Sequence, residues 1–198
     1  MKIKCITNKV SAIPKEILKN YIIQTETFSI KPGKEYLVYA TSIYLDYIWY
    51  CICDEHKTFY PIWTPGMLFE VTDSRLSRYW IFGLHQADRD ENVKKVPFLS
   101  FPEWVNDVNF YSDLIDGYSD DSNAIIFRKY KEVMYLEYPD PSISAIAQIG
   151  DENWLICPQC IDAWQSNNNK DALVKCPKCH TVYNNPRYDE SVIFEPLL

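Results

Sequence analysis

The sequence has little glycine, histidine and methionine, with five, three and three residues among 198. So little glycine excludes collagen-like and Gly-rich low-complexity chains, and 47% hydrophobic with 15% aromatic residues is typical of a folded globular protein. A Gly-rich phosphate loop and the G-x-S-x-G nucleophile motif are both absent. None of the three histidines, His56, His85 and His180, lies in a recognisable catalytic motif. These absences predict that the protein is not an enzyme.

Long hydrophobic runs are also absent. The first residues, MKIKCITNKV, lack the apolar stretch that follows the basic start of a signal peptide. No window reaches the eighteen apolar residues that a transmembrane helix requires. We therefore expect a soluble, cytoplasmic protein with no membrane partner.

Negative charge is abundant and unevenly spread. The net charge is −7 and the isoelectric point is about 5.0. Positions 103 to 140 contain nine acidic residues and only three basic ones, so this segment contributes −6 of the net charge of −7. Such a cluster is most often a solvated face, but it also suits a basic protein partner. The candidate partner-binding residues are Glu103, Asp107, Asp113, Asp116, Asp120 and Asp121.

One stretch, LICPQCIDAWQSNNNKDALVKCPKCHTVY, carries a strong chemical signature. Two Cys-Pro-X-Cys segments are separated by fifteen residues, so the candidate metal ligands are Cys157, Cys160, Cys176 and Cys179. The segment also repeats internally, because a shift of nineteen residues aligns WLICPQCIDAW with LVKCPKCHTVY. Each copy predicts a strand, a tight turn that presents two thiolates, and a return strand.

This segment resembles the zinc ribbon and rubredoxin-like superfamily over residues 152–187. The resemblance implies one structural zinc ion in a closed tetrahedral site, with no position left open for a substrate. Iron is the competing ion. Rubredoxins, however, usually have glycine after the second cysteine of each pair, where this chain has Ile161 and His180. About 35 residues bury too little surface to fold alone, which explains the need for a metal.

The other three cysteines are expected to be reduced, buried thiols, because an odd number without a signal peptide does not favour disulfides. Cys51, Cys53 and His56 form a C-x-C-x2-H string. A second metal site there lacks a fourth ligand, and a Cys53–His56 nucleophilic pair lacks a third, orienting residue. We interpret the two cysteines as part of the core.

The pattern of elements predicts an α+β fold in four parts. Residues 1–98 are expected to form an antiparallel β-meander that curls into a small SH3-like barrel, with one helix at 11–21. In this part, DYIWYCICD is apolar on both faces and predicts a central strand. Residues 99–150 are expected to form an acidic helical segment that packs on the barrel. Its helices would begin at a capping box on Ser100 and near residue 122, with a short third helix at 141–150. A zinc ribbon at 151–188 and a C-terminal tail at 189–198, docked as a strand, complete the chain.

Many zinc ribbons bind nucleic acid, and a nucleic-acid-binding or regulatory zinc-ribbon protein is the alternative function. A binding ribbon should present several Lys or Arg side chains with interleaved aromatic residues. Residues 152–187 contain four basic residues against three acidic ones, in a chain whose overall charge repels phosphate. We therefore do not expect nucleic acid to be the partner.

The run YIWYCICDE…FYPIWTPGMLFEVTDSRLSRYWIFG, followed by FPEWVND and the ribbon, resembles the small bacterial immunity proteins of polymorphic toxin systems, of the contact-dependent and Rhs types. Immunity proteins of this kind commonly cover basic toxin domains with acidic patches. The resemblance implies a non-catalytic protein that binds and neutralises a cognate toxin domain. It agrees with the distribution of charge.

Overall fold

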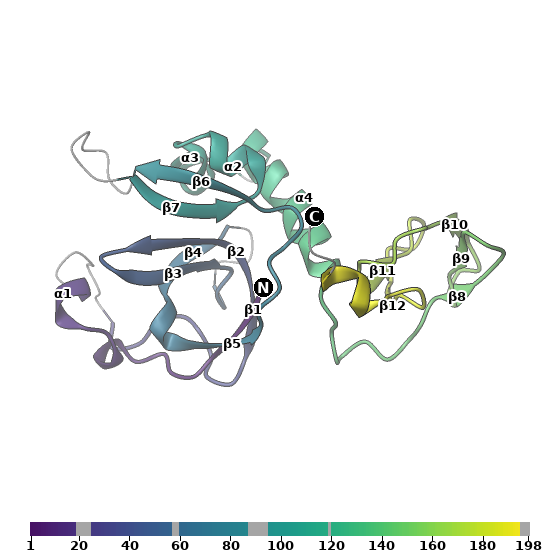
Figure 1. The fold of residues 1–198 in the computed structure, drawn as a ribbon, viewed down its shortest axis with the longest axis horizontal. Helices are drawn as coiled ribbons and strands as arrows, with labels where there is room; N and C mark the ends of the chain where they lie inside the picture. The colour runs from purple at the N-terminus through teal and green to yellow at the C-terminus, as the bar shows by residue number, and fades with distance from the viewer. Residues whose placement is uncertain (19–24, 57–59, 87–94, 119, 195–198) are drawn as a thin grey trace. The chain divides into compact units, whose positions relative to one another are not determined.

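The computed structural model describes residues 1–18, 25–56, 60–86, 95–118 and 120–194. The chain forms two compact units, Met1–Lys131 (unit 1) and Glu132–Leu198 (unit 2) (Figure 1). The predicted helical segment 99–150 therefore spans the division between them. No helix among the described residues is long and apolar enough to cross a membrane.

Unit 1 is built on a seven-stranded sheet in which every ladder is antiparallel. Its strands are β1 (Lys2–Cys5), β2 (Glu35–Tyr44), β3 (Tyr47–Ile52), β4 (Ile62–Pro65), β5 (Phe69–Asp73), β6 (Ile81–Gln86) and β7 (Lys95–Ser100). The main path runs β4-β3-β2-β1-β5, and β6 joins through β7, which pairs with β2. The prediction of an α+β fold dominated by antiparallel sheet is confirmed.

The predicted SH3-like barrel is wrong, because the ladders among the described residues do not close. The ten-residue strand β2 pairs along one side with β3, and its other side is divided between two partners. Its first half pairs with β1, whereas Thr41 and Ser42 pair with β7. In the ladder with β3, the register shifts between Val38 and Ala40. The sheet therefore branches at β2, and β4 and β5 remain at the two ends of the path.

The β2–β3 hairpin shows how local sequence shapes this sheet. Leu45 and Asp46 both have positive φ angles, 51° and 64°, as a two-residue type I′ turn requires. β3 pairs with β2 on one side and with β4 on the other, which confirms that it is a central strand. Cys51 and Ile52 are completely buried within it, as the apolar character of both faces predicts.

The helices of unit 1 are short, apart from the last, which begins in unit 1 and ends in unit 2. They are the 3-10 turns η1 (Val10–Ala12) and η2 (Gly66–Leu68) and the α-helices α1 (Lys15–Leu18), α2 (Pro102–Asn106), α3 (Phe110–Asp116) and α4 (Ser122–Leu136). The capping box predicted at Ser100 is wrong, because this residue ends β7 and its hydroxyl donates to Tyr39 O at 2.9 Å. Phe101 is the N-cap of α2 instead. The predicted helix at 122 corresponds to α4, whereas the predicted helix at 11–21 extends partly outside the described residues.

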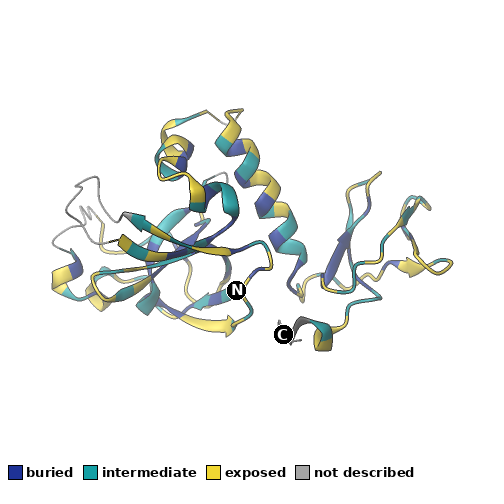
Figure 2. Ribbon diagram, turned by 45° about the horizontal axis from the view of Figure 1, so that its top comes forward, coloured by how far each residue is buried: buried dark blue, intermediate teal, exposed yellow. Residues whose placement is uncertain are grey.

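Aromatic side chains join these helices to the sheet. Phe101 is fully buried and stacks on Tyr130 of α4 with ring centroids 4.0 Å apart. Tyr39 of β2 meets Phe127 of α4 edge to face at 5.1 Å. Buried positions recur along one side of α4 (Figure 2), so the first part of this helix belongs to the core of unit 1.

Unit 2 contains five short strands after the end of α4. They are β8 (Gln148–Ile149), β9 (Trp154–Ile156), β10 (Ala163–Gln165), β11 (Leu173–Lys175) and β12 (Val182–Asn184). β8, β9 and β10 form one antiparallel sheet, and β11 and β12 form another. The predicted helix at 141–150 is wrong, because this segment contains β8 and a bridge from Ile146 to Asn184. In the tail, Glu190–Phe194 forms a 3-10 helix, η3, in place of the predicted strand, and residues 195–198 lie outside the described residues.

Candidate metal centre

The two Cys-Pro-X-Cys segments of unit 2 fold as the same turn twice. In the first, the amide of Cys157 donates to Asp162 O at 2.9 Å and the amide of Ile161 donates to Cys157 O at 3.0 Å. In the second, Cys176 and His180 make the equivalent bonds at 2.9 and 3.0 Å. Ile161 and His180 also share a left-handed backbone, with φ angles of 60° and 61°. The nineteen-residue repeat in the sequence is therefore a repeat in the structure.

These turns bring four sulfurs together. The Sγ atoms of Cys157, Cys160, Cys176 and Cys179 all lie within 4.8 Å of one another. The shortest separations join the two turns, at 3.6 Å between Cys157 and Cys179 and 3.7 Å between Cys160 and Cys176. Disulfide sulfurs would be about 2.05 Å apart. Four sulfurs placed about 2.3 Å from a central ion are about 3.8 Å apart, so these cysteines are positioned to bind one metal ion tetrahedrally.

The pKa values of the two thiols in the first turn are shifted in opposite directions. Burial opposes ionisation of Cys157, but hydrogen bonds from the Tyr183 hydroxyl, at 3.2 Å, and from backbone amides lower its pKa to about 6. At Cys160 a backbone hydrogen bond at Asp162 favours the thiolate, but burial and the three neighbouring sulfurs raise its pKa to about 12. Side-chain and backbone hydrogen bonds at Thr181 lower the pKa of Cys179. A bound cation would stabilise the thiolate forms of these crowded groups.

The sulfurs also lie in the core of unit 2. Its buried cluster consists of Ala147, Leu155, Cys157, Val174, Cys176 and Tyr183, with Cys160, Trp164 and Cys179 packed against it. Four of these nine residues are the candidate ligands. A bound ion would therefore be held by residues of this hydrophobic cluster. Two of its ligands, Cys157 and Cys176, are completely buried.

No family model, curated protein or solved structure matches the chain.

The four cysteines are the only group with metal-ligand geometry among the described residues. His180, which follows Cys179 in the chain, is exposed and does not belong to this group. In the C-x-C-x2-H string, Cys51 is buried whereas His56 is exposed. Burial raises the pKa of the Cys53 thiol to about 11, with Lys131 and Tyr39 acting in the opposite direction. A thiol with so high a pKa is a poor nucleophile at neutral pH.

The acidic residues fall into two groups in unit 1. Asp113, Asp116, Asp120 and Asp121 are exposed where α3 ends and α4 begins, and we name this group the acidic turn. No ion pair among the described residues joins any of these four carboxylates to a lysine or arginine. Asp121 also shapes the loop, because its Oδ2 accepts from the amide of Tyr118 at 2.7 Å.

Glu103 and Asp107 lie on α2 and at its C-terminal end. Glu103 is half-buried, with one carboxylate oxygen enclosed. Burial, followed by a hydrogen bond to Glu103, raises the pKa of Tyr130 to about 12. Asp107 is exposed and accepts from the amide of Asn109 at 2.9 Å. Among the six candidate residues, the acidic turn therefore carries most of the exposed negative charge.

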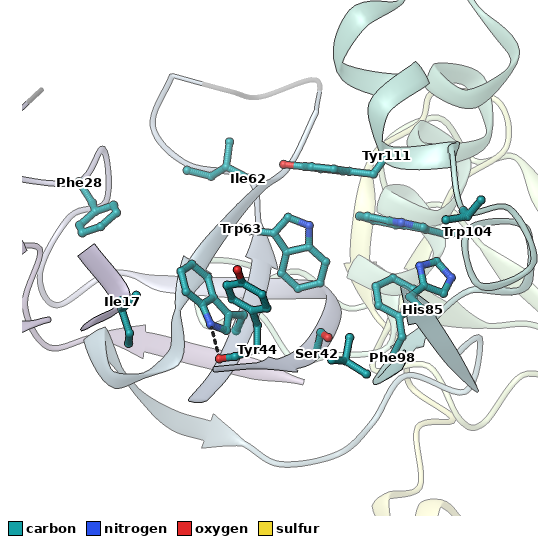
Figure 3. Close-up of a pocket in the computed structure, with 13 residues that line it drawn as sticks. Ile17, Phe28, Ser42, Tyr44, Ile62, Trp63, His85, Phe98, Trp104 and Tyr111 are labelled. Carbon is teal, nitrogen blue, oxygen red and sulfur yellow. Dashed lines mark hydrogen bonds between the residues drawn. The ribbon is translucent and has the colours of Figure 1, made fainter. Parts of the chain in front are cut away.

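Sequence patterns did not predict a cavity in unit 1. The aromatic residues of β2, β3, β4, β7, α2 and α3 form core contacts, as expected, but they also line a cavity of about 680 Å³ (Figure 3). The alternating apolar residues indicated burial and gave no sign that the packing would leave space, because a cavity depends on long-range contacts between elements.

Proposed function

We propose that the chain is a non-catalytic, cytoplasmic inhibitor of the immunity type, which binds and neutralises a cognate, basic toxin domain and contains one structural zinc ion. The metal assignment is supported by the four sulfurs, since four thiolates complete a tetrahedral zinc site and leave no position for substrate or water. A role in stability is supported by the place of these ligands, since two of them belong to a buried hydrophobic cluster of unit 2 and the other two pack against it.

Elemental analysis of the purified protein tests the identity of the metal. We expect one equivalent of zinc per chain and no visible absorption, because zinc has a filled d shell. An iron centre would absorb strongly in the visible range through thiolate-to-iron charge transfer. One equivalent of iron with reversible redox activity would contradict the zinc assignment and would favour electron transfer.

The partner assignment depends on the acidic turn. Its four carboxylates are exposed and have no cationic partner among the described residues, so their mutual repulsion is uncompensated in the free protein. A basic protein surface would relieve that repulsion and would also be attracted from a distance, which increases the association rate. The net charge of −7 also favours a basic partner, and it opposes binding to nucleic acid.

Charge reversal tests this assignment. The test variant carries Asp113→Lys, Asp116→Lys and Asp120→Lys, and it leaves Asp121 in place to hold the loop. The matched control carries Asp151→Lys, Glu152→Lys and Glu190→Lys, three exposed positions in unit 2 that change the net charge equally. Both variants would be expressed with the toxin domain encoded beside the gene, and association would be followed by stopped-flow mixing at two salt concentrations.

We expect the test variant to associate about ten to one hundred times more slowly than the wild type at low salt, with a flatter salt dependence and loss of growth protection. The control should retain growth protection, since its changed residues lie outside the proposed contact. If the test variant protects cells and associates as well as the control, the acidic turn is not the contact surface. A toxin domain that binds neither the wild type nor the control would refute the immunity assignment itself.

A further inference from the structure

The cavity in unit 1 lies between the sheet and the helices that follow it. β2 and β3 supply Ser42, Tyr44 and Trp49, and β4 supplies Trp63. β7 pairs with β2 and, together with β6, continues this wall, and α2 and α3 also contribute lining side chains. The volume of the cavity, about 680 Å³, falls within the range of small-molecule sites, about 300–1,000 Å³. Its described lining residues all belong to unit 1, whereas the four cysteines belong to unit 2.

Flat rings form most of the cavity wall, and they hold one another in place. Trp63 meets Phe98, Trp104 and Tyr111 with ring centroids 6.0, 6.2 and 6.2 Å apart. Trp104 and Tyr111 are nearly parallel, with an interplanar angle of 6° (Figure 3). On the strand side, Tyr44 packs edge to face against Trp49. Rings fixed in this way provide ready-made surfaces for stacking with another ring.

The described part of the lining carries few polar atoms, and none of the side chains in that part is aspartate, glutamate, lysine or arginine. Ser42 donates to Pro97 O at 2.9 Å. His85 stacks on Phe98 at 4.0 Å, and its Nε2 lies 2.9 Å from Val105 O, so the proton of a neutral ring lies on Nε2. The Nδ1 atom then remains a hydrogen-bond acceptor. Within the described ranges, Nδ1 and the Tyr44 hydroxyl make no hydrogen bond to another residue.

From the ring walls, the volume and the lack of charged side chains among the described lining residues, we propose that this cavity binds an uncharged, planar aromatic small molecule. An ionised ligand would lose part of its hydration in the cavity and find no opposite charge among these residues, which disfavours anions and cations. A planar ring system can stack on the indole and phenol faces. The imidazole Nδ1 and the Tyr44 hydroxyl then orient a polar substituent of the ligand.

Binding of a fluorescent uncharged probe, N-phenyl-1-naphthylamine, to the full-length protein tests the proposal. Its emission increases in an apolar site, so saturable binding is measured directly. Bound probe is then displaced with 2-naphthol, with 1-naphthoate or with phenyltrimethylammonium, which are neutral, anionic and cationic. We expect the neutral competitor to act at a concentration at least about tenfold lower than either ion.

Three variants test whether the probe binds in this cavity. Trp63→Ala removes the central ring, and we expect affinity to fall about tenfold or more. Val108→Trp adds a ring at an exposed lining position, so it obstructs the cavity without removing any core side chain, and it should weaken binding similarly. Trp154→Leu removes a tryptophan from unit 2 and should leave binding unchanged.

Three results would each overturn the proposal. The first is the absence of saturable binding to the wild type. The second is unchanged binding by Val108→Trp, which would place the probe on another apolar surface whether or not Trp63→Ala folds. The third is displacement by phenyltrimethylammonium at a lower concentration than by 2-naphthol, which would indicate an aromatic cage for organic cations.

Discussion

Removal of one metal ligand should unfold unit 2 and leave unit 1 folded. The variant Cys176→Ser replaces a completely buried sulfur with a hydroxyl that is a poor ligand for zinc. Structural zinc contributes about 10–16 kcal/mol of apparent binding free energy in finger peptides. The free energy of unfolding of whole domains is only about 5–15 kcal/mol. The free energy lost with the ion is therefore as large as the whole free energy of unfolding expected for a unit of this size.

Tryptophan signals report this change, because Trp154 and Trp164 belong to unit 2 and Trp164 packs against the sulfur cluster. We expect the variant, and the wild type after chelation, to lose part of the near-UV circular dichroism and to become sensitive to protease between residues 132 and 198. Metal content should fall from one equivalent to none. Cys53→Ser is the matched control, because this half-buried thiol lies outside the cluster, and it should retain the metal and the dichroism.

The outcome that refutes the reasoning is a metal-free protein with unchanged near-UV dichroism and unchanged protease resistance in unit 2. The apolar residues of the cluster would then suffice for folding without an ion. A Cys53→Ser variant that lost its metal would equally contradict the assignment of the four ligands.

Three further predictions concern stability and metal affinity. Asp73→Asn should cost about 1–2 kcal/mol at pH 7, measured by urea unfolding, because hydrogen bonds from Arg75 outweigh burial and lower the pKa of Asp73 below its ordinary value of 3.8. Because the folded pKa is the lower one, this stabilisation is complete above about pH 5 and is lost as the pH falls through the folded pKa, so the two proteins should converge in acid. Gly83→Ala should cost about 1–3 kcal/mol, since the new Cβ would lie 2.3 Å from Val105 Cγ1. Addition of Val105→Ala should recover part of this loss, and a neutral Gly83→Ala variant would show that α2 moves freely. Tyr183→Phe should keep the fold but weaken zinc binding about tenfold to one hundredfold in chelator competition, because it removes a hydroxyl 3.2 Å from a ligand sulfur. An unchanged affinity would mean that this hydroxyl does not stabilise the thiolate.

The metal centre could be predicted from sequence because its information is local. Each pair of cysteines lies within one turn, and the second turn repeats the first after nineteen residues. β3 and α4 were predictable for the same reason, since their apolar patterns extend over their whole lengths. Local periodicity thus identified the elements whose structure depends mainly on their own stretch of sequence.

The failures involve contacts between distant residues. The motif at Ser100 satisfies the local rule for a capping box, but its hydroxyl bonds to a carbonyl 61 positions earlier in the chain. The prediction of a barrel was wrong for a similar reason. One side of β2 pairs partly with β1 and partly with β7, and no local sequence pattern specifies this division. The aromatic cavity could not be predicted either, since its volume depends on how α2 and α3 pack against the sheet.

The left-handed residues after the second cysteine of each turn have a consequence for how the site evolves. Ile161 and His180 adopt a backbone that costs a residue with a Cβ atom roughly 1–2 kcal/mol, and a β-branched side chain is especially unsuited to it. Glycine would adopt both angles without this cost, and an ion bound by the four sulfurs would offset the strain that the present side chains impose on the loops. Replacement of either by glycine should make the empty loops resemble the loaded ones more closely, and the protein would then depend less on its supply of metal.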